Sequence, residues 1–240
     1  MRGCPFLIEV LTRAIQKALN QSNPQITWGQ DMQTERGAPV HLNIPFYRQH
    51  YDYTCGPASL MMAMKYLEED LHLGKDLEID LWREGNLVAA WGTSRYGLAY
   101  SAAIRGFSAG VTSNSGGIDF VDRFVPPLTD PDMQMLKAHF YERRARCRKL
   151  GVRERRGTVT AKTLGKSLLL NHVPLIVTNS FFFGTEDLPH WVAVTGIDDK
   201  WMYFNNPLDA RSLKRKIGLS AFQKFVGYHG DQSMVEVWRQ

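Results

Sequence analysis

The chain has 240 residues, of which 44% are hydrophobic and 22% charged, so it can bury a sizeable core without disulfides or a metal. Its three cysteines, Cys4, Cys55 and Cys147, are odd in number and far apart, which argues against a disulfide framework and a Cys-x-x-Cys zinc or redox site. The net charge of +5 is mildly basic, and no apolar run is long enough to span a bilayer. We therefore expect a soluble globular protein without a cofactor.

Residues 1–38 are predicted to form an amphipathic helix followed by a polar linker arm. Glu9, Arg13 and Lys17 interrupt the apolar residues of this helix, so it lacks the continuous apolar region of a signal peptide. Docking of the helix on the core is favoured over a membrane anchor. These features predict a cytoplasmic protein.

The rest of the chain separates into a helical part and a part made of strands. A short strand is expected at 40–49 and a helix at 56–69, and short helices and loops at 85–130 are followed by a helix that ends near 150. After a helix at 160–171, the apolar and β-branched runs at 172–183, 190–197, 201–206 and 233–239 predict strands, with a hairpin turn at 198–200. Segregated helices and strands of this kind favour an α+β fold.

Basic residues concentrate between 143 and 156, in the stretch RRARCRKLGVRERR. A nucleic-acid surface would need accompanying aromatic residues or a known motif, and the stretch has neither. We therefore interpret it as a solvated helix end followed by a basic loop, with an acidic peptide or protein as an open alternative partner.

Cys55 stands directly before Gly-Pro, where a helix begins. The free backbone N–H groups and the dipole at a helix N-terminus stabilise a thiolate, which is the nucleophilic form of cysteine. Pro57 suits the first turn because its missing N–H costs nothing there. This position indicates a reactive thiol with a lowered pKa, whereas Cys4 and Cys147 are interpreted as incidental.

A thiol nucleophile needs a proton acceptor, and His190 is the best candidate because it opens the strand HWVAVTGI. The competitors are His50, which is near Cys55 in sequence, and His172. A strand start holds a side chain firmly while letting it face a cleft, although a surface histidine is common at such a position. We therefore predict His190 as the general base.

A third residue should orient the imidazole of that histidine, and the stretch YFNNPLD supplies the candidates Asn206 and Asp209. Asn206 ends the strand that pairs with the histidine strand across the hairpin, which would bring it close to His190. Asn205 alternates to the other face, so only one of the two asparagines should serve. The alternative is that Asn-Asn-Pro is simply a turn.

Acyl transfer also requires hydrogen-bond donors for the developing oxyanion. The backbone N–H of Cys55 is one candidate, and the side-chain amide of Gln49, six residues earlier, is the other.

The order Gln, Cys at a helix start, His at a late strand and Asn at the end of the next strand is that of papain-like thiol peptidases. The stretches YDYTCGPASLMMAMKYL, HWVAVTGID and YFNNP resemble the double-glycine peptidase family, papain-like proteases that trim leader peptides from bacteriocins. In that family the third residue is an Asp, and here Asn206 occupies its position. Gln49 matches the family's oxyanion glutamine by its spacing.

This resemblance implies a papain-like α+β domain at 39–240, with an insertion at about 85–157 that forms either a lid or a packed subdomain. It also implies a free-standing bacterial cysteine peptidase, acting on a peptide or protein through Cys55, His190, Asn206 and Gln49. An acyltransferase with the same triad and a catalytically silent peptide-binding module are the alternatives.

Overall fold

The computed structural model describes residues 39–239, except 88–89, 119–120, 122–126 and 210–214. By its contacts the chain divides into a unit from Met1 to Glu35 and a unit from Arg36 to Gln240. The N-terminal helix and arm expected at 1–38, with Cys4, lie outside the described residues.

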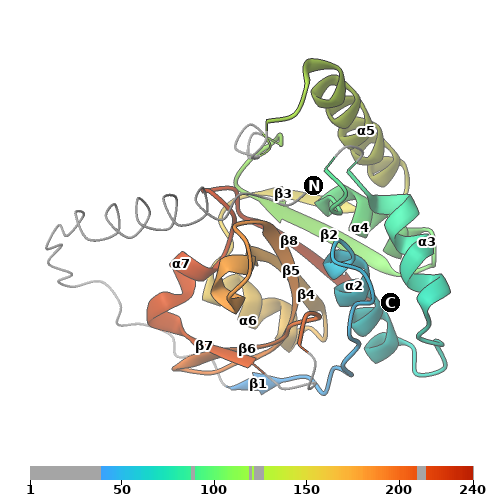
Figure 1. Ribbon diagram of the computed structural model, residues 1–240. Helices are drawn as coiled ribbons and strands as arrows, with labels where there is room; N and C mark the ends of the chain where they lie inside the picture. Colours follow the sequence, from blue (N-terminus) through green and yellow to red (C-terminus); the bar gives the residue numbers. More distant parts are fainter. Residues whose placement is uncertain (1–38, 88–89, 119–120, 122–126, 210–214, 240) are drawn as a thin grey trace, which may run out of the picture. The chain divides into compact units, whose positions relative to one another are not determined.

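The centre of this unit is one sheet, and eight strands of the described residues belong to it (Figure 1). The path runs β3-β2-β8-β4-β5-β6-β7, and β1 pairs with β5 beyond the end of β4. All neighbours are antiparallel except β2 and β3. The strands are β1 (Val40–His41), β2 (Ser108–Ser113), β3 (Arg153–Arg156), β4 (Val173–Asn179), β5 (Pro189–Ile197), β6 (Trp201–Asn205), β7 (Arg215–Gly218) and β8 (Ser233–Trp238).

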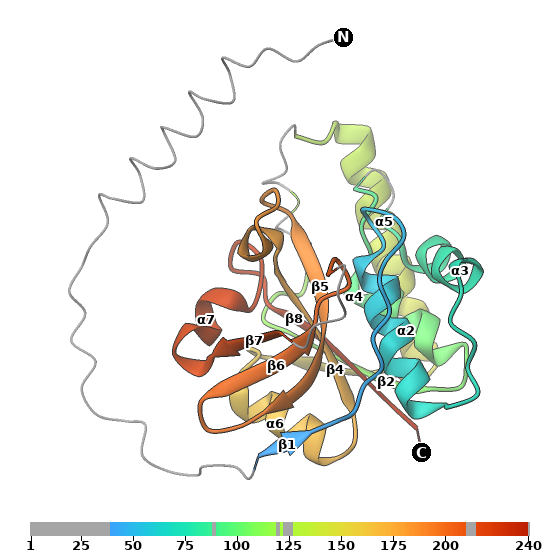
Figure 2. The same ribbon diagram turned by 60° about the horizontal axis from the view of Figure 1, so that its bottom comes forward.

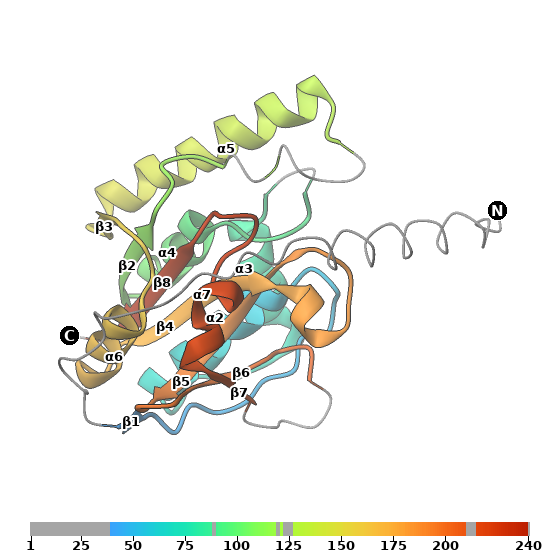
Figure 3. The same cartoon turned by 90° about the vertical axis from the view of Figure 1, so that its left-hand side faces the viewer.

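Helices cover both faces of the sheet, and Figures 2 and 3 show this division from two further sides. One face packs against α2 (Cys55–Leu67) and α4 (Arg95–Ala103), and α3 (Lys75–Gly85) and α5 (Asp130–Lys149) pack on these helices in turn. The other face packs against α6 (Ala161–Leu169) and the short α7 (Phe222–Phe225).

The alternation of side chains along each strand creates the two cores. In β4, Leu175 and Val177 face the α2 side, whereas Ile176 faces α6 and α7. In β5, Ala193 faces the α2 side and Val194 faces α6 and α7. Strands buried on both faces read as continuous apolar runs, which explains the sequences VPLIV and WVAV.

The structure confirms most of the elements expected from the pattern. The helix at 56–69 is α2, and the strands and hairpin at 190–206 are β5 and β6. The helix at 160–171 is α6, which Thr160 caps by accepting a hydrogen bond from the backbone N–H of Thr163. The α+β class is therefore correct.

Other expected elements differ from the structure. The strand expected at 40–49 is regular only at Val40 and His41, because the following residues leave the ladder near Pro45. The strand expected at 172–183 ends at Asn179, whose side chain caps a 3₁₀ turn at Ser180–Phe183. The sequence pattern also gave no sign of α3, β2, β3, β7 and α7.

The segment 85–157 contributes to the sheet and to the core. Its strand β2 pairs with β8 on one side and with β3 on the other, and Leu136 and Phe140 of α5 are fully buried. The basic stretch is therefore a helix end followed by the edge strand β3, where a loop was expected. Arg144 and Arg148 both pair with Glu154, which offsets part of the basic charge.

Candidate active site

Cys55 is the first residue of α2 and is only 6% exposed. The helix can begin this close to the sheet because the next residue is glycine: a β-carbon at Gly56 would lie 3.0 Å from Thr93 and 3.2 Å from Trp191. Ser59, one turn further along α2, donates a hydrogen bond to the carbonyl of Trp191 at 3.2 Å. The N-terminus of α2 is therefore held against β5.

His190 is the second residue of β5 and is 3% exposed. It is opposite Thr178 of β4, and the ring of Phe183 packs edge-on against its imidazole with 5.4 Å between the centroids. The backbone N–H of Trp191, the next residue, donates a hydrogen bond to the sulfur of Cys55. The sheet thus places the histidine one residue from a direct contact with the candidate nucleophile.

Asn206 lies next to His190, as the hairpin pairing predicted, with 2.8 Å between Asn206 Oδ1 and His190 Nε2. The same oxygen accepts the backbone N–H of Leu208 at 3.1 Å, which identifies it as the oxygen of the amide. His190 Nε2 must therefore carry a proton and donate it to Asn206. In a neutral imidazole this leaves Nδ1 as the proton acceptor.

The competing residues face other partners. Asn205 donates its side-chain amide to the carbonyl of Ile44 at 3.2 Å. Both carboxylate oxygens of Asp209 bind Arg215 at 2.8 Å. His50 Nδ1 is 2.8 Å from the carboxylate of Glu78, and His172 stacks on Trp238 with 4.3 Å between the rings.

Gln49 lies in the segment that leads to α2 and is 8% exposed. Its side-chain Nε2 donates to the carbonyl of Tyr51 at 2.7 Å, and its backbone N–H donates to the carbonyl of Pro207 at 3.0 Å. The second bond ties this segment to the turn that carries Asn206. Within the described residues, Gln49 Oε1 is buried without a hydrogen-bond partner.

Glu78 of α3 organises this segment and was not singled out from the sequence. Its side chain is fully buried, and it accepts hydrogen bonds from the hydroxyl of Tyr47 at 2.9 Å, the backbone N–H of His50 at 2.8 Å and the hydroxyl of Thr54. These three residues flank Gln49 and precede Cys55. The spacing of Glu78 from Leu81 and Gly85, the other buried residues of α3, was the available signal.

Burial favours the neutral forms of the Cys55 thiol and the His190 imidazole. The expectation of a lowered pKa for the Cys55 thiol is therefore wrong. Burial raises the pKa of Cys55 to about 11, although backbone N–H groups of Trp191, Gly56 and Cys55 act against it. Burial also lowers the pKa of His190 to about 4, against the opposing effects of Asn206 and the charge of Asp209. Desolvation of the charged forms therefore outweighs the donors at the helix N-terminus.

The other thiol among the described residues, that of Cys147, differs from Cys55 in its surroundings. Cys147 is 2% exposed in α5, its sulfur contacts the carbonyl of Tyr96 at 3.2 Å, and burial raises its pKa to about 12. It has no histidine among the contacts described here.

A cavity of about 50 Å³ opens beside Cys55. Pro189 and Trp191, the neighbours of His190 in β5, also line it. Its other walls come from the segment before α4, from α4 and α5, and from β4 and β8. The candidate nucleophile thus faces a cavity between helices α2, α4 and α5 and the strands β4, β5 and β8 of the sheet.

The described residues contain neither a metal-binding cluster nor a membrane-spanning helix. Within residues 39–239, gaps excepted, no group of three His, Cys, Asp or Glu side chains could hold a metal ion. Over the same residues, no helix has the length and apolar character needed to cross a membrane.

Comparisons with known proteins agree with this architecture. The model of a family described as the Peptidase_C39 like family matches residues 44–222. A solved structure described as a C39-like peptidase from Bacillus anthracis is similar, with a TM-score of 0.51 and 17% identity over 85% of this chain and 100% of that one. A double glycine motif protease from an AMS/PCAT transporter, in complex with the leader peptide, gives a TM-score of 0.46 and 16% identity over 82% and 96% of the two chains.

No curated protein matches this chain. The similarity to the C39-like structure shows that the fold is papain-like, with Cys55 on the helical side and His190 and Asn206 on the sheet. The family match and the fold together support a peptidase function in general.

Proposed function

Because this chain belongs to the Peptidase_C39 like family, we propose that it is a cysteine peptidase whose catalytic residues are Cys55, His190, Asn206 and Gln49. The observation that carries the proposal is the hydrogen bond from His190 Nε2 to Asn206 Oδ1, because it leaves Nδ1 as the basic nitrogen. The cavity beside Cys55 supports a peptide as the substrate, since the candidate thiol itself lines a space that a substrate side chain could enter.

In the proposed reaction the thiol of Cys55 gives its proton to Nδ1 of His190 as the sulfur attacks the peptide carbonyl. The neutral states found for both groups favour this general-base route over a resting imidazolium–thiolate pair. His190 then protonates the leaving amine, and a thioester remains on Cys55. Water hydrolyses the thioester, with His190 again accepting a proton.

Gln49 and the backbone N–H of Cys55 are the proposed donors to the oxyanion. Gln49 Nε2 has a second hydrogen besides the one that it gives to Tyr51. Loss of one such donor typically lowers turnover by about a hundredfold to a thousandfold.

The test is cleavage of a complex peptide mixture, with products identified by mass spectrometry. We expect cleavage by the unmodified protein, none by Cys55→Ala and a loss of about a thousandfold or more for His190→Ala. Cys147→Ala is the matched control, because that thiol is buried without a histidine contact among the described residues, and it should retain activity.

Cleavage that persists in a folded Cys55→Ala protein would contradict the proposal. The product masses also separate hydrolysis from acyl transfer, because amide adducts with an added amine would show that the thioester passes to an amine in place of water.

A further inference from the structure

The cavity beside Cys55 is lined by both apolar and polar residues. The apolar lining includes Leu87, Ile118, Phe140, Val177 and Trp191. The polar lining includes Thr93, Arg95 and Asp231. A space of this kind accepts a side chain with an apolar stem and a polar tip.

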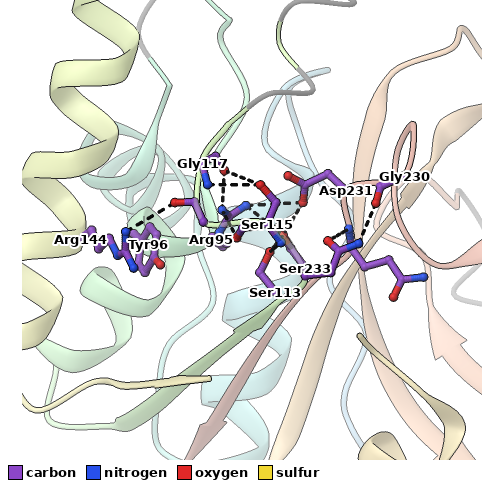
Figure 4. A network of polar contacts seen from close by, with 12 residues as sticks. Arg95, Tyr96, Ser113, Ser115, Gly117, Arg144, Gly230, Asp231 and Ser233 are labelled. Carbon is purple, nitrogen blue, oxygen red and sulfur yellow. Dashed lines mark hydrogen bonds and ion pairs between the residues drawn. The ribbon is translucent and has the colours of Figure 1, made fainter. Parts of the chain in front are cut away.

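Two of these polar residues, Arg95 and Asp231, form a buried ion pair with 3.5 Å between Arg95 Nη1 and Asp231 Oδ1 (Figure 4). Their side chains are only 2% and 9% exposed. Arg95 also donates to the hydroxyl of Ser233 at 3.1 Å and to the carbonyls of Ser115, at 3.1 Å, and Gly117. The pair is therefore held rigidly from several elements, and its two charges offset each other.

Some buried polar atoms around the cavity have no hydrogen-bond partner among the described residues. Among the described residues, Asp231 Oδ2, Arg95 Nε and Thr93 Oγ1 are buried without a hydrogen-bond partner, and all three residues line the cavity. Buried polar atoms in proteins are nearly always paired, so three unpaired ones around one cavity call for an occupant. Asp231 Oδ2 needs a donor and Arg95 Nε needs an acceptor.

We propose that this cavity is a specificity pocket of the enzyme for a substrate side chain that ends in a neutral carboxamide, that of glutamine or asparagine. This inference rests on the proposed peptidase function. The NH₂ of the carboxamide donates to Asp231 Oδ2, and its oxygen accepts from Arg95 Nε. A lysine would bring a second cation against Arg95, and a glutamate a second anion against Asp231, so both are disfavoured.

Peptidyl vinyl sulfones test this pocket because they place a side chain at a defined distance from the thiol that they alkylate. Two series, acetyl-Ala-X-Gly-vinyl sulfone and acetyl-Ala-Gly-X-vinyl sulfone, carry Gln, Met, Lys or Glu at X. Met matches Gln in length without its hydrogen bonds. We expect Gln to inactivate the protein about tenfold to a hundredfold faster than Met at one of the two positions, with mass mapping showing the adduct on Cys55.

The outcomes separate the pocket from the proposed function. Adducts on Cys55 with equal rates for Gln and Met at both positions would overturn the pocket and leave the peptidase proposal standing. If no probe in either series alkylated Cys55, the peptidase proposal would fail and the pocket with it.

Asp231→Asn provides a second test, because it places an amide NH₂, a hydrogen-bond donor, where a carboxylate oxygen was an acceptor. The preference for Gln should fall about tenfold and the rate with Glu should rise. Asp80→Asn is the matched control: Asp80 is an exposed aspartate of α3, and its loss should change neither rate.

Loss of the Asp231 charge leaves Arg95 buried without its anion, so Thr93→Val provides a second variant in case Asp231→Asn does not fold. Thr93→Val keeps the shape of the side chain and removes only its unpaired hydroxyl. It should change the ratio of the Gln and Met rates at the same probe position, and an unchanged ratio in both folded variants would overturn the pocket.

Discussion

At the scale of single residues, burial decides the resting chemistry of the candidate site. Cys55 lies at a helix N-terminus, as the sequence predicted, and backbone N–H groups contact its sulfur. The thiol is nevertheless shielded from water, and its pKa rises to about 11. Helix-terminal donors lower a thiol pKa only where the cost of desolvation does not exceed their effect.

We therefore predict that Cys55 behaves as an unactivated thiol in the free protein. Its alkylation by iodoacetamide should rise about tenfold per pH unit from pH 7 to 10, because only the thiolate reacts and the pKa lies near 11. The measurement is the alkylation rate at each pH, with peptide mapping to separate Cys55 from Cys4 and Cys147. A rate that is already constant near pH 7 would show a stable thiolate and contradict this expectation.

At the scale of elements, α3 positions the segment that carries Gln49. The single carboxylate of Glu78 binds Tyr47, His50 and Thr54, which lie on both sides of Gln49. None of these contacts reaches the proposed reacting atoms, so Glu78 is a positioning residue. Its burial on the inner face of α3 makes each hydrogen bond sensitive to loss.

Glu78→Gln should lower both stability and turnover. An NH₂ group would replace one acceptor oxygen, leaving a buried donor of the segment unpaired at a cost of about 1–3 kcal/mol in the free energy of unfolding. Displacement of Gln49 should lower kcat by about tenfold to a hundredfold with a smaller change in KM. Urea unfolding and steady-state kinetics measure the two effects.

Glu69→Gln, on an exposed residue after α2, is the control and should leave both quantities unchanged. If Glu78→Gln lowered stability but left kcat intact, Glu78 would support the fold without positioning Gln49.

At the scale of the whole described unit, a buried neutral histidine ties stability to pH. Burial lowers the pKa of His190 to about 4 from an ordinary value of 6.5. Above pH 6.5 the residue is neutral in both the folded and the unfolded state, and its contribution to stability is complete. As the pH falls toward 4 only the unfolded chain gains the proton, so the contribution is lost.

We predict that His190→Gln removes part of this acid sensitivity. The difference amounts to about 3 kcal/mol in the free energy of unfolding between pH 7 and 4. Urea unfolding of both proteins over that range measures it. Burial also lowers the pKa of His139, so the variant should keep some acid sensitivity. Parallel pH profiles for the two proteins would show that His190 is not held neutral.

The sequence by itself determined the elements with strong local signals and the residues that they carry. The Gly-Pro after Cys55 predicted the start of α2, and the hairpin after the strand of His190 predicted the contact with Asn206. Both signals are local: a helix start needs only its first turn, and a two-strand register follows from the turn that joins the strands.

Only the tertiary structure decided the rest. The strand β2, with the sequence SAGVTS, has no alternating pattern, and its place in the sheet comes from pairing with β8, which lies more than a hundred residues away. The burial of Glu78, the raised pKa of Cys55 and the unpaired atoms of Arg95 and Asp231 likewise depend on which elements cover them. Desolvation is a property of the packed surroundings, so no pattern of neighbouring residues in the chain could reveal it.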